Sequence, residues 1–125
     1  MHARLLAMGV ATLALALAGC AARPESTVED FYYAVADGDT EKAESLMSSK
    51  IRAMVPSAKL QAALALGAEQ ARECGGISEV EVNLDEGEQI RTGTATVTYK
   101  GSCPSKTEKV KLVKEDGEWK LDANK

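Results

Sequence analysis

Histidine is almost absent from this sequence, and aromatic side chains are scarce. The 125 residues contain one histidine, His2, and 4 % aromatic residues. Because His2 lies in an N-terminal segment that we expect to be removed, the mature chain has no imidazole for a general base, a Ser-His-Asp triad or a metal ligand. The glycines also form no phosphate-binding pattern. These shortages exclude the commonest hydrolase mechanisms and predict no metal site.

The sequence also has no excess of positive charge and no apolar run of the length that spans a membrane. It has 15 Lys and Arg against 19 Asp and Glu, a formal net charge of −4, which argues against a nucleic-acid partner. Its 45 % hydrophobic and 27 % charged residues are typical of a globular protein. A chain of 125 residues is long enough for one domain.

The first nineteen residues have the pattern of a targeting peptide. Arg4 precedes a thirteen-residue apolar segment, Leu5 to Leu17, which is shorter than the roughly 20 residues that a spanning helix needs. Removal of this segment with Arg4 changes the formal charge from −4 to −5. We therefore expect an acidic mature protein on the far side of a membrane.

The end of this segment, Leu17-Ala18-Gly19-Cys20, resembles the lipobox of bacterial lipoprotein precursors. The resemblance implies cleavage before Cys20 and a diacylglyceryl group on its sulfur; two or more acyl chains, at about 0.8 kcal/mol per buried methylene, give stable anchoring. Ala21, where an aspartate would signal retention in the inner membrane, favours the periplasmic face of the outer membrane. We expect a signal peptide at 1–19, a lipidated tether at 20–25 and one domain at 26–125.

The mature part begins with helical patterns. Ser26 to Glu29 reads as a capping box, followed by an apolar stripe that Gly38 ends. A second helix is predicted from Thr40, as N-cap, to about Ser49. Residues 51–55 are either a brief strand or the approach to a third helix, which the spacing of small and apolar residues predicts from about Ala58 to Glu73.

From residue 77 onward the apolar period changes from 3.6 to 2. Alternating segments at 79–84, 94–100, 109–112 and 118–122 predict four strands, each with one buried face. Asp116-Gly117 is typical of a two-residue hairpin turn, which places Lys114 opposite Trp119 and Leu112 opposite Leu121. Short connections favour an antiparallel meander. The fold class is therefore α+β, with the helices covering the apolar face of the sheet.

Cys74 and Cys103 are predicted to form a disulfide. An exported protein folds in an oxidising compartment, and pairing of the first two strands would bring Ile77 beside Lys100, so that both cysteines flank one edge. A zinc site or a redox site is disfavoured because there is no further Cys or His nearby and no C-x-x-C motif.

Three segments carry a resemblance to a known family: residues 24–32, 37–43 and 110–122. They resemble small bacterial lipoproteins of unknown function in the nuclear-transport-factor-2-like, cystatin-like superfamily. The resemblance implies N-terminal helices packed on one face of a curved four-stranded antiparallel sheet. Because this superfamily includes isomerases, dehydratases, transport factors and binding modules, it leaves function open.

Tyr32, Tyr99 and Trp119 are the candidate lining of a pocket between the first helix and the sheet. In the same superfamily, ketosteroid isomerase combines a tyrosine with acidic residues. We expect no Asp or Glu at an inward-facing strand position here, so a general base is missing. We therefore predict no enzyme and no cofactor, with an isomerase-like or dehydratase-like enzyme, or a purely structural envelope component, as the alternatives.

Lys109, Lys111 and Lys120 are predicted to share the outer face of the sheet. They are either solvated lysines that protect the sheet from edge pairing or an interaction face. Two functions follow for a protein held at the membrane by its lipidated N-terminus. One is a non-catalytic module that binds a small apolar ligand, and the other is docking onto an envelope protein or a second copy in a homodimer.

Overall fold

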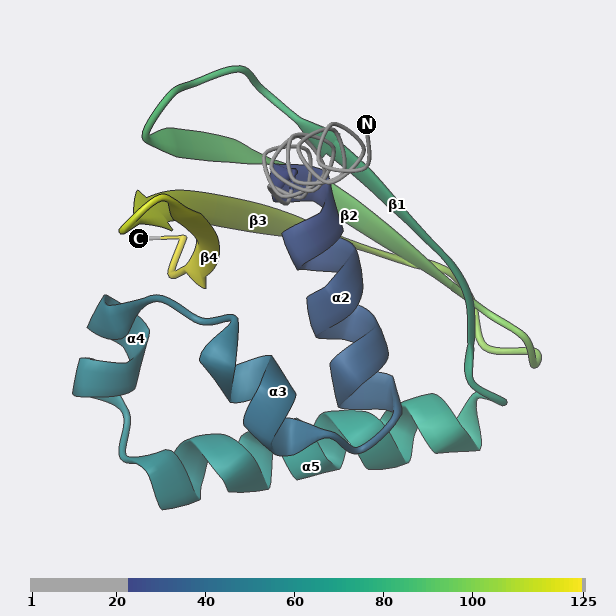
Figure 1. The fold of residues 1–125 in the computed structure, drawn as a ribbon. Coiled ribbons are helices and arrows are strands. Elements are labelled where there is room, and N and C mark those ends of the chain that lie inside the picture. Colours follow the sequence, from purple (N-terminus) through teal and green to yellow (C-terminus); the bar gives the residue numbers. More distant parts are fainter. Residues whose placement is uncertain (1–22, 125) are drawn as a thin grey trace, which may run out of the picture.

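The computed structural model describes residues 23–124, in which helices come first and strands follow (Figure 1). The predicted signal peptide and Cys20 lie outside the described residues. The helices are α2 (Pro24–Ala36), α3 (Thr40–Ser45), α4 (Ser49–Met54) and α5 (Ser57–Glu73). The strands are β1 (Ile77–Leu84), β2 (Ile90–Tyr99), β3 (Lys106–Glu115) and β4 (Glu118–Asp122).

The four strands form one antiparallel sheet in the order β1-β2-β3-β4, which confirms the predicted meander. The last hairpin has the predicted register, with Lys114 opposite Trp119 and Leu112 opposite Leu121. Asp116 and Gly117 both have positive φ angles, 52° and 81°. These are the conformations that a type I′ hairpin turn requires at its two central residues.

The start of α2 differs from the prediction. The helix begins at Pro24, two residues before the expected capping box, and its N-cap residue Arg23 makes no side-chain cap. Proline suits the first helical position because the amide it lacks would have no partner there. Pro24 and Glu25, assigned to the tether, are therefore helical. Thr27 is buried, and its hydroxyl donates to the backbone carbonyl of Trp119 in β4 at 3.4 Å.

The segment after α2 is also divided differently. Asp39, rather than Thr40, caps α3, and its carboxylate accepts the amide of Lys42 at 3.2 Å. The helix ends at Ser45, well before the predicted end near Ser49. Residues 51–55, left open between strand and helix, fall largely within α4. The two short helices are separated by residues 46–48, which pair with the sheet.

Ser48 connects residues 46–48 to β4 through hydrogen bonds. Its side chain is completely buried, accepts the amide of Ile51 at 3.2 Å and donates to Asp122 at 2.7 Å. Burial alone would raise the pKa of Asp122, but hydrogen bonds from Ser48 and the backbone of Ala123 hold it below its ordinary value. The backbone of Leu121 also exchanges hydrogen bonds with Leu46 and Ser48. The outer edge of β4 is thus paired, whereas no strand among residues 23–124 lies beside the outer edge of β1.

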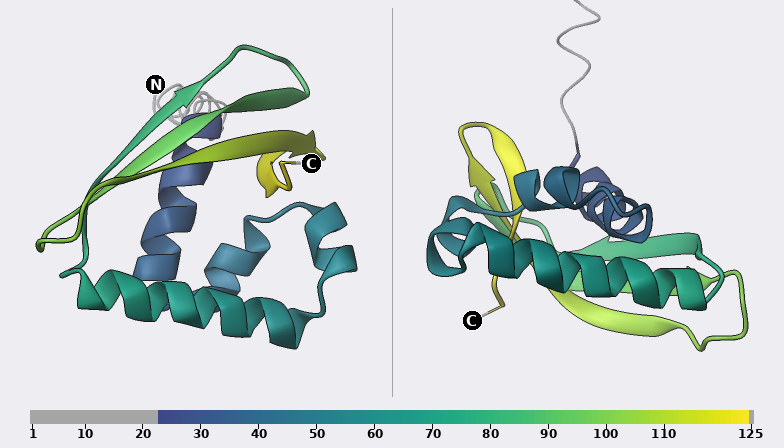
Figure 2. Two further views of the ribbon diagram at one scale, coloured as in Figure 1. Left: turned by 180° about the vertical axis from the view of Figure 1, so that it is seen from behind. Right: turned by 90° about the horizontal axis from the view of Figure 1, so that it is seen from below.

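The core has two parts. In the first, α2 lies across the concave face of the curved sheet, where Val28 and Leu112 are completely buried (Figure 2). The second forms where α2, α3 and α5 meet, around Ala34, Ala43 and Leu64. These two clusters place the helices on one face of the sheet, as predicted.

The predicted disulfide is present between Cys74, just after α5, and Cys103, in the β2–β3 connection. Ile77 pairs with Tyr99 rather than with the expected Lys100, whose amide bonds to Gly76 instead. Gly75 and Gly101 permit a very close approach of the two segments. A Cβ atom on Gly101 would lie 2.7 Å from the carbonyl oxygen of Cys74, and Gly75 has a φ of +84°.

Loss of the disulfide is expected to destabilise the protein strongly. Closing a loop with a sequence separation of 29 residues contributes about 3 to 4 kcal/mol in the chain-entropy model. The double variant Cys74→Ala/Cys103→Ala should therefore lower Tm by more than about 10 °C, measured by circular dichroism. Reductant should lower Tm of the unmodified protein similarly and leave that of the variant unchanged; equal Tm values would contradict this prediction.

Candidate functional site

The inward face of β3 changes from apolar to charged along its length. Leu112 and Val110 belong to the core, and the next two residues with the same alternation are Glu108 and Lys106. Opposite them, α5 presents the small residues Gly67 and Ala71. A Cβ atom on Gly67 would lie only 2.9 Å from Val35, so this part of α5 lies close against α2. Because the residues of α5 are small here and those of β3 are charged, a cavity remains between the helices and the sheet beyond the core.

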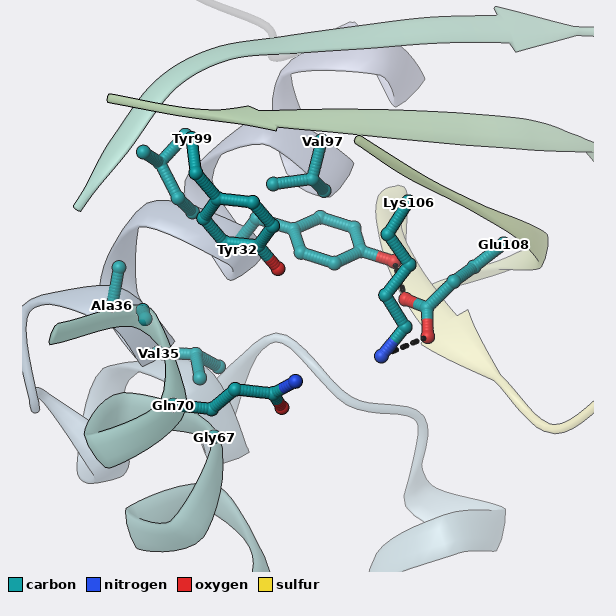
Figure 3. Close-up of a pocket in the computed structure, with 11 residues that line it drawn as sticks. Tyr32, Val35, Ala36, Gly67, Gln70, Val97, Tyr99, Lys106 and Glu108 are labelled. Atoms are coloured by element: carbon teal, nitrogen blue, oxygen red, sulfur yellow. Dashed lines mark hydrogen bonds and ion pairs between the residues drawn. The ribbon is translucent and has the colours of Figure 1, made fainter. Parts of the chain in front are cut away.

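The cavity has a volume of about 140 Å³ and lies beside the second half of α2 (Figure 3). Its apolar wall includes Val35, Ala36, Ala71, Ile77 and Val97. Its polar lining consists of Tyr32, Gln70, Tyr99, Lys106 and Glu108. A cavity of similar size, roughly 150 Å³, holds a benzene molecule in an engineered protein. The space therefore fits a ring-sized chemical group.

Tyr32 and Glu108 form the principal polar contact of the cavity. The Tyr32 hydroxyl donates to Oε1 of Glu108 at 2.6 Å. Burial, followed by this hydrogen bond and the charge of Glu108, raises the pKa of Tyr32 well above its ordinary value. The phenol is therefore neutral at physiological pH and acts as a donor. On the other side, the ammonium of Lys106 lies 3.4 Å from Oε2 of Glu108.

Glu108 corrects one expectation from the sequence. We expected no acidic residue on an inward-facing strand position, but Glu108 points into the cavity (Figure 3). The signal was available, because Glu108 has the same strand alternation as Val110 and Leu112. It was missed because the predicted strand begins at residue 109, whereas β3 begins at Lys106, so that Glu108 is part of the strand.

Two of the three predicted pocket residues, Tyr32 and Tyr99, line this cavity, and Trp119 does not. Trp119 lies in the core near the start of α2, where Thr27 bonds to its backbone. Two cationic groups lie over its ring, with Arg91 at 5.5 Å and Lys114 at 5.4 Å from the centroid. The Trp119 side chain packs in the core, so the prediction that it lines the pocket is wrong.

A second hollow of about 300 Å³ adjoins the cavity. The two share Gln70, Tyr99 and Lys106, and the second extends to the disulfide and to Pro104. A ligand larger than one ring could therefore place a ring in the inner cavity and its remainder along the disulfide.

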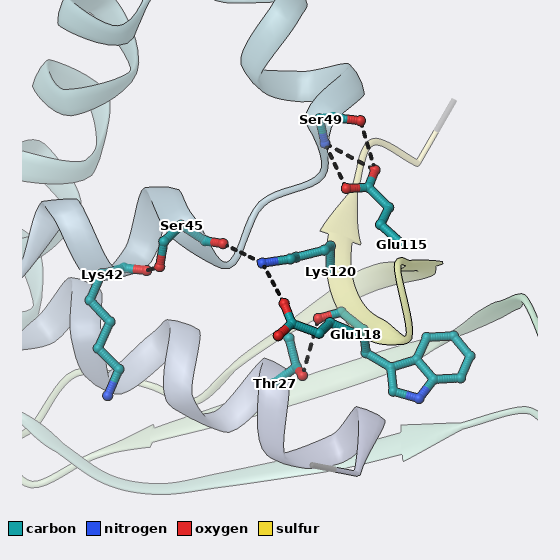
Figure 4. A network of polar contacts seen from close by, with 8 residues as sticks. Thr27, Lys42, Ser45, Ser49, Glu115, Glu118 and Lys120 are labelled. Atoms are coloured by element: carbon teal, nitrogen blue, oxygen red, sulfur yellow. Dashed lines mark hydrogen bonds and ion pairs between the residues drawn. The ribbon is translucent and has the colours of Figure 1, made fainter. Parts of the chain in front are cut away.

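The predicted lysine face is only partly available. Lys109 is exposed on β3, but the ammonium of Lys120 donates to the carbonyl of Ser45 at 2.8 Å and lies 3.4 Å from Glu118 (Figure 4). The side chain of Lys120 is 18 % exposed. Lys111 is partly buried and is paired in register with Asp122. Lys120 thus connects the end of α3 to β4.

Comparison with known proteins identifies a family and a fold. Residues 18–122 match the model of a domain of unknown function, DUF4878. A crystal structure of a protein from Campylobacter jejuni, described as a candidate NTF2-like transpeptidase, superimposes with a TM-score of 0.70 and 20 % sequence identity, covering 82 % of this chain and 100 % of that one. A search of curated proteins found no match.

The described part of the chain, residues 23–124, has neither a membrane-spanning helix nor a cluster of metal ligands. No helix in this range is long and apolar enough to cross a membrane. Within the same range, no group of three or more His, Cys, Asp or Glu residues is placed to hold a metal ion. The cavity beside Tyr32 and Glu108, where an apolar wall meets several polar groups, is the candidate site.

The contact between Tyr32 and Glu108 predicts a specific pH dependence of stability. Tyr32→Phe removes a hydrogen bond to a carboxylate and should lower the free energy of unfolding by about 1.5 kcal/mol near neutral pH. Because the pKa of Tyr32 is raised in the folded chain above its ordinary value of 10.0, this contribution is complete below about pH 10 and is lost as pH rises further. The difference between wild type and variant should therefore shrink above about pH 10.

Urea unfolding followed at several pH values measures this difference. Tyr33→Phe is the matched control, because Tyr33 is the next residue in α2 and is 39 % exposed. A constant difference between wild type and Tyr32→Phe across the alkaline range would contradict the prediction.

Proposed function

We propose a ligand-binding role for this chain, which belongs to the DUF4878 family of domains of unknown function and has the NTF2-like fold. In this proposal, the protein is anchored by lipid to the cell envelope and holds a small, partly apolar ligand between α2, α5 and the sheet. The supporting observation is the cavity itself, in which a carboxylate, a neutral phenol and an amide converge on an apolar wall. A concave apolar space with a few convergent polar groups is the usual form of a binding site.

The chemistry of the cavity favours binding over catalysis. The Glu108 carboxylate accepts the hydroxyl of Tyr32 through Oε1, and its Oε2 lies 3.4 Å from the ammonium of Lys106. The lining of the cavity includes no second acid and no Ser, Thr or Cys that could serve as a nucleophile. In the adjoining hollow, the two cysteines are joined in the disulfide, and the hydroxyl of Ser105 is hydrogen-bonded to that of Thr98 at 3.2 Å. We therefore propose that the protein is not an enzyme, although its solved neighbour is described as a candidate transpeptidase.

The proposed anchor limits where the ligand comes from. If Cys20 is lipidated, four residues of chain bring Pro24 within about 14 Å of the anchor. Tyr32, Val35 and Ala36 follow 8 to 12 residues later in α2, which places them about 12 to 18 Å further along the helix axis. The cavity then lies at the end of α2 opposite Pro24, up to about 30 Å from the anchor. We propose a ligand drawn from the aqueous periplasm, with the protein on the periplasmic face of the outer membrane.

Native mass spectrometry should detect this ligand. We expect the protein, released gently from detergent micelles, to carry a small molecule in substoichiometric or full amount. Ala36→Phe should remove it, because the new ring occupies the cavity that Ala36 lines. Ala65→Phe, on an exposed position of α5, is the matched control and should retain it. The absence of any bound molecule from the unmodified protein would count against the binding role.

Lipidation at Cys20 has a separate test. Cells that produce the protein in the presence of a labelled fatty acid should incorporate the label, and mass spectrometry should place it on an N-terminal cysteine. Cys20→Ser should abolish incorporation of the label. Cys74→Ser/Cys103→Ser should still incorporate it, measured per amount of variant protein present in the cells. Label on the Cys20→Ser variant, or none on the unmodified chain, would refute the anchor without affecting the cavity.

A further inference from the structure

We infer that the ligand is a primary amine, whose ammonium group replaces that of Lys106 on the Glu108 carboxylate while its apolar body fills the cavity. This inference rests on the proposed function and specifies the chemical class that the site takes. Three features of the cavity support it: an anionic group that faces inward, an internal cation that is easily displaced, and an apolar wall of ring size.

Glu108 supplies the recognition group. Its carboxylate faces the cavity and is held in place by the hydroxyl of Tyr32 at 2.6 Å. Tyr32 is fixed in turn by its position on α2, so the carboxylate is oriented by a separate element of the fold. A carboxylate that is only partly exposed, beside apolar side chains, binds a cation more strongly than one in open water.

Lys106 occupies the place of the ligand's ammonium. It precedes Glu108 by two residues on the same face of β3, and its ammonium points into the space between Glu108 and Gln70 (Figure 3). The side chains of Lys106 and Glu108 are 51 % and 40 % exposed. Ion pairs of this exposure contribute about 0 to 1 kcal/mol, so the lysine can swing into solvent at little cost in free energy.

The rest of the cavity fits the body of such an amine. Val35, Val97 and Ala71 supply apolar contact, and the side chain of Tyr99 lines the same cavity (Figure 3). An anionic ligand is disfavoured because it would approach Glu108, while Lys106, the one cation among the lining residues, is already paired there.

Three matched probes test the charge preference. The complete chain, purified in detergent micelles, is titrated calorimetrically with 2-phenylethylamine, 2-phenylethanol and 3-phenylpropionate, and titrations into micelles alone are subtracted. We expect the amine to bind at least about tenfold more tightly than the alcohol or the acid, the difference that one hydrogen bond to a charged group supplies.

Two substitutions assign the preference to the cavity. Glu108→Gln should weaken amine binding at least about tenfold. Glu118→Gln should not, although Glu118 forms an ion pair of the same 3.4 Å length with a lysine on its own strand, outside the cavity. Lys106→Met should tighten amine binding about two- to fivefold, because the competing ammonium is gone. Lys109→Met, on the outer face of β3, should have no effect.

The gain in affinity distinguishes the inference from a folding defect, because a misfolded variant cannot bind more tightly. Equal or tighter binding of the alcohol or the acid, or weaker amine binding by Lys106→Met, would overturn the inference and leave the binding role in place. If no probe binds and native mass spectrometry shows no retained molecule, the binding role and the inference both fail.

Discussion

The packing of α2 across the concave face of the sheet is the contact on which the rest of the structure depends. The sheet has one apolar face, and it is covered chiefly where Val28 meets Leu112, both completely buried. The hydroxyl of Thr27 adds a direct bond from α2 to the backbone of β4. Because the sheet is twisted and the helix is straight, the two surfaces stay in contact over a limited length. The core therefore fills the space between α2 and the sheet at one end, and other residues line that space at the opposite end.

At that other end, the two layers are joined covalently. The disulfide ties the end of α5 to the β2–β3 connection, and the approach of Gly75 to Gly101 brings their backbones together. Between this joint and the core lie small side chains on α5 and charged ones on β3. The cavity exists because the layers are held at both ends and are not filled in the middle. The polar contact of Tyr32 with Glu108 then crosses the gap in place of apolar packing.

The sequence predicted the sheet well because alternation and hairpin chemistry are local. Asp116 and Gly117 set the register of the last two strands, and the expectation of export together with the strand pairing predicted the disulfide. Helix starts were less predictable, because Ser26 and Thr40 have good capping chemistry but compete with Pro24 and Asp39 nearby. The cavity was the hardest feature to anticipate. It depends on how far α5 and β3 lie apart, which the sequence pattern does not encode, and Trp119 was misplaced for the same reason.

The two edges of the sheet are unequal, and this limits how copies of the chain could associate by strand pairing. Residues 46–48 satisfy the outer edge of β4, while β1 carries Glu79 and Glu81 on an edge that no strand covers in the described part of the chain. A fibril that grows by strand pairing needs two free sheet edges on every subunit, because each subunit must pair with one neighbour on either side. A subunit with a single free edge can join one other copy about a two-fold axis, after which no edge remains. The short pairing at Leu46 and Ser48 thus blocks the growth of a strand-paired polymer from the β4 edge.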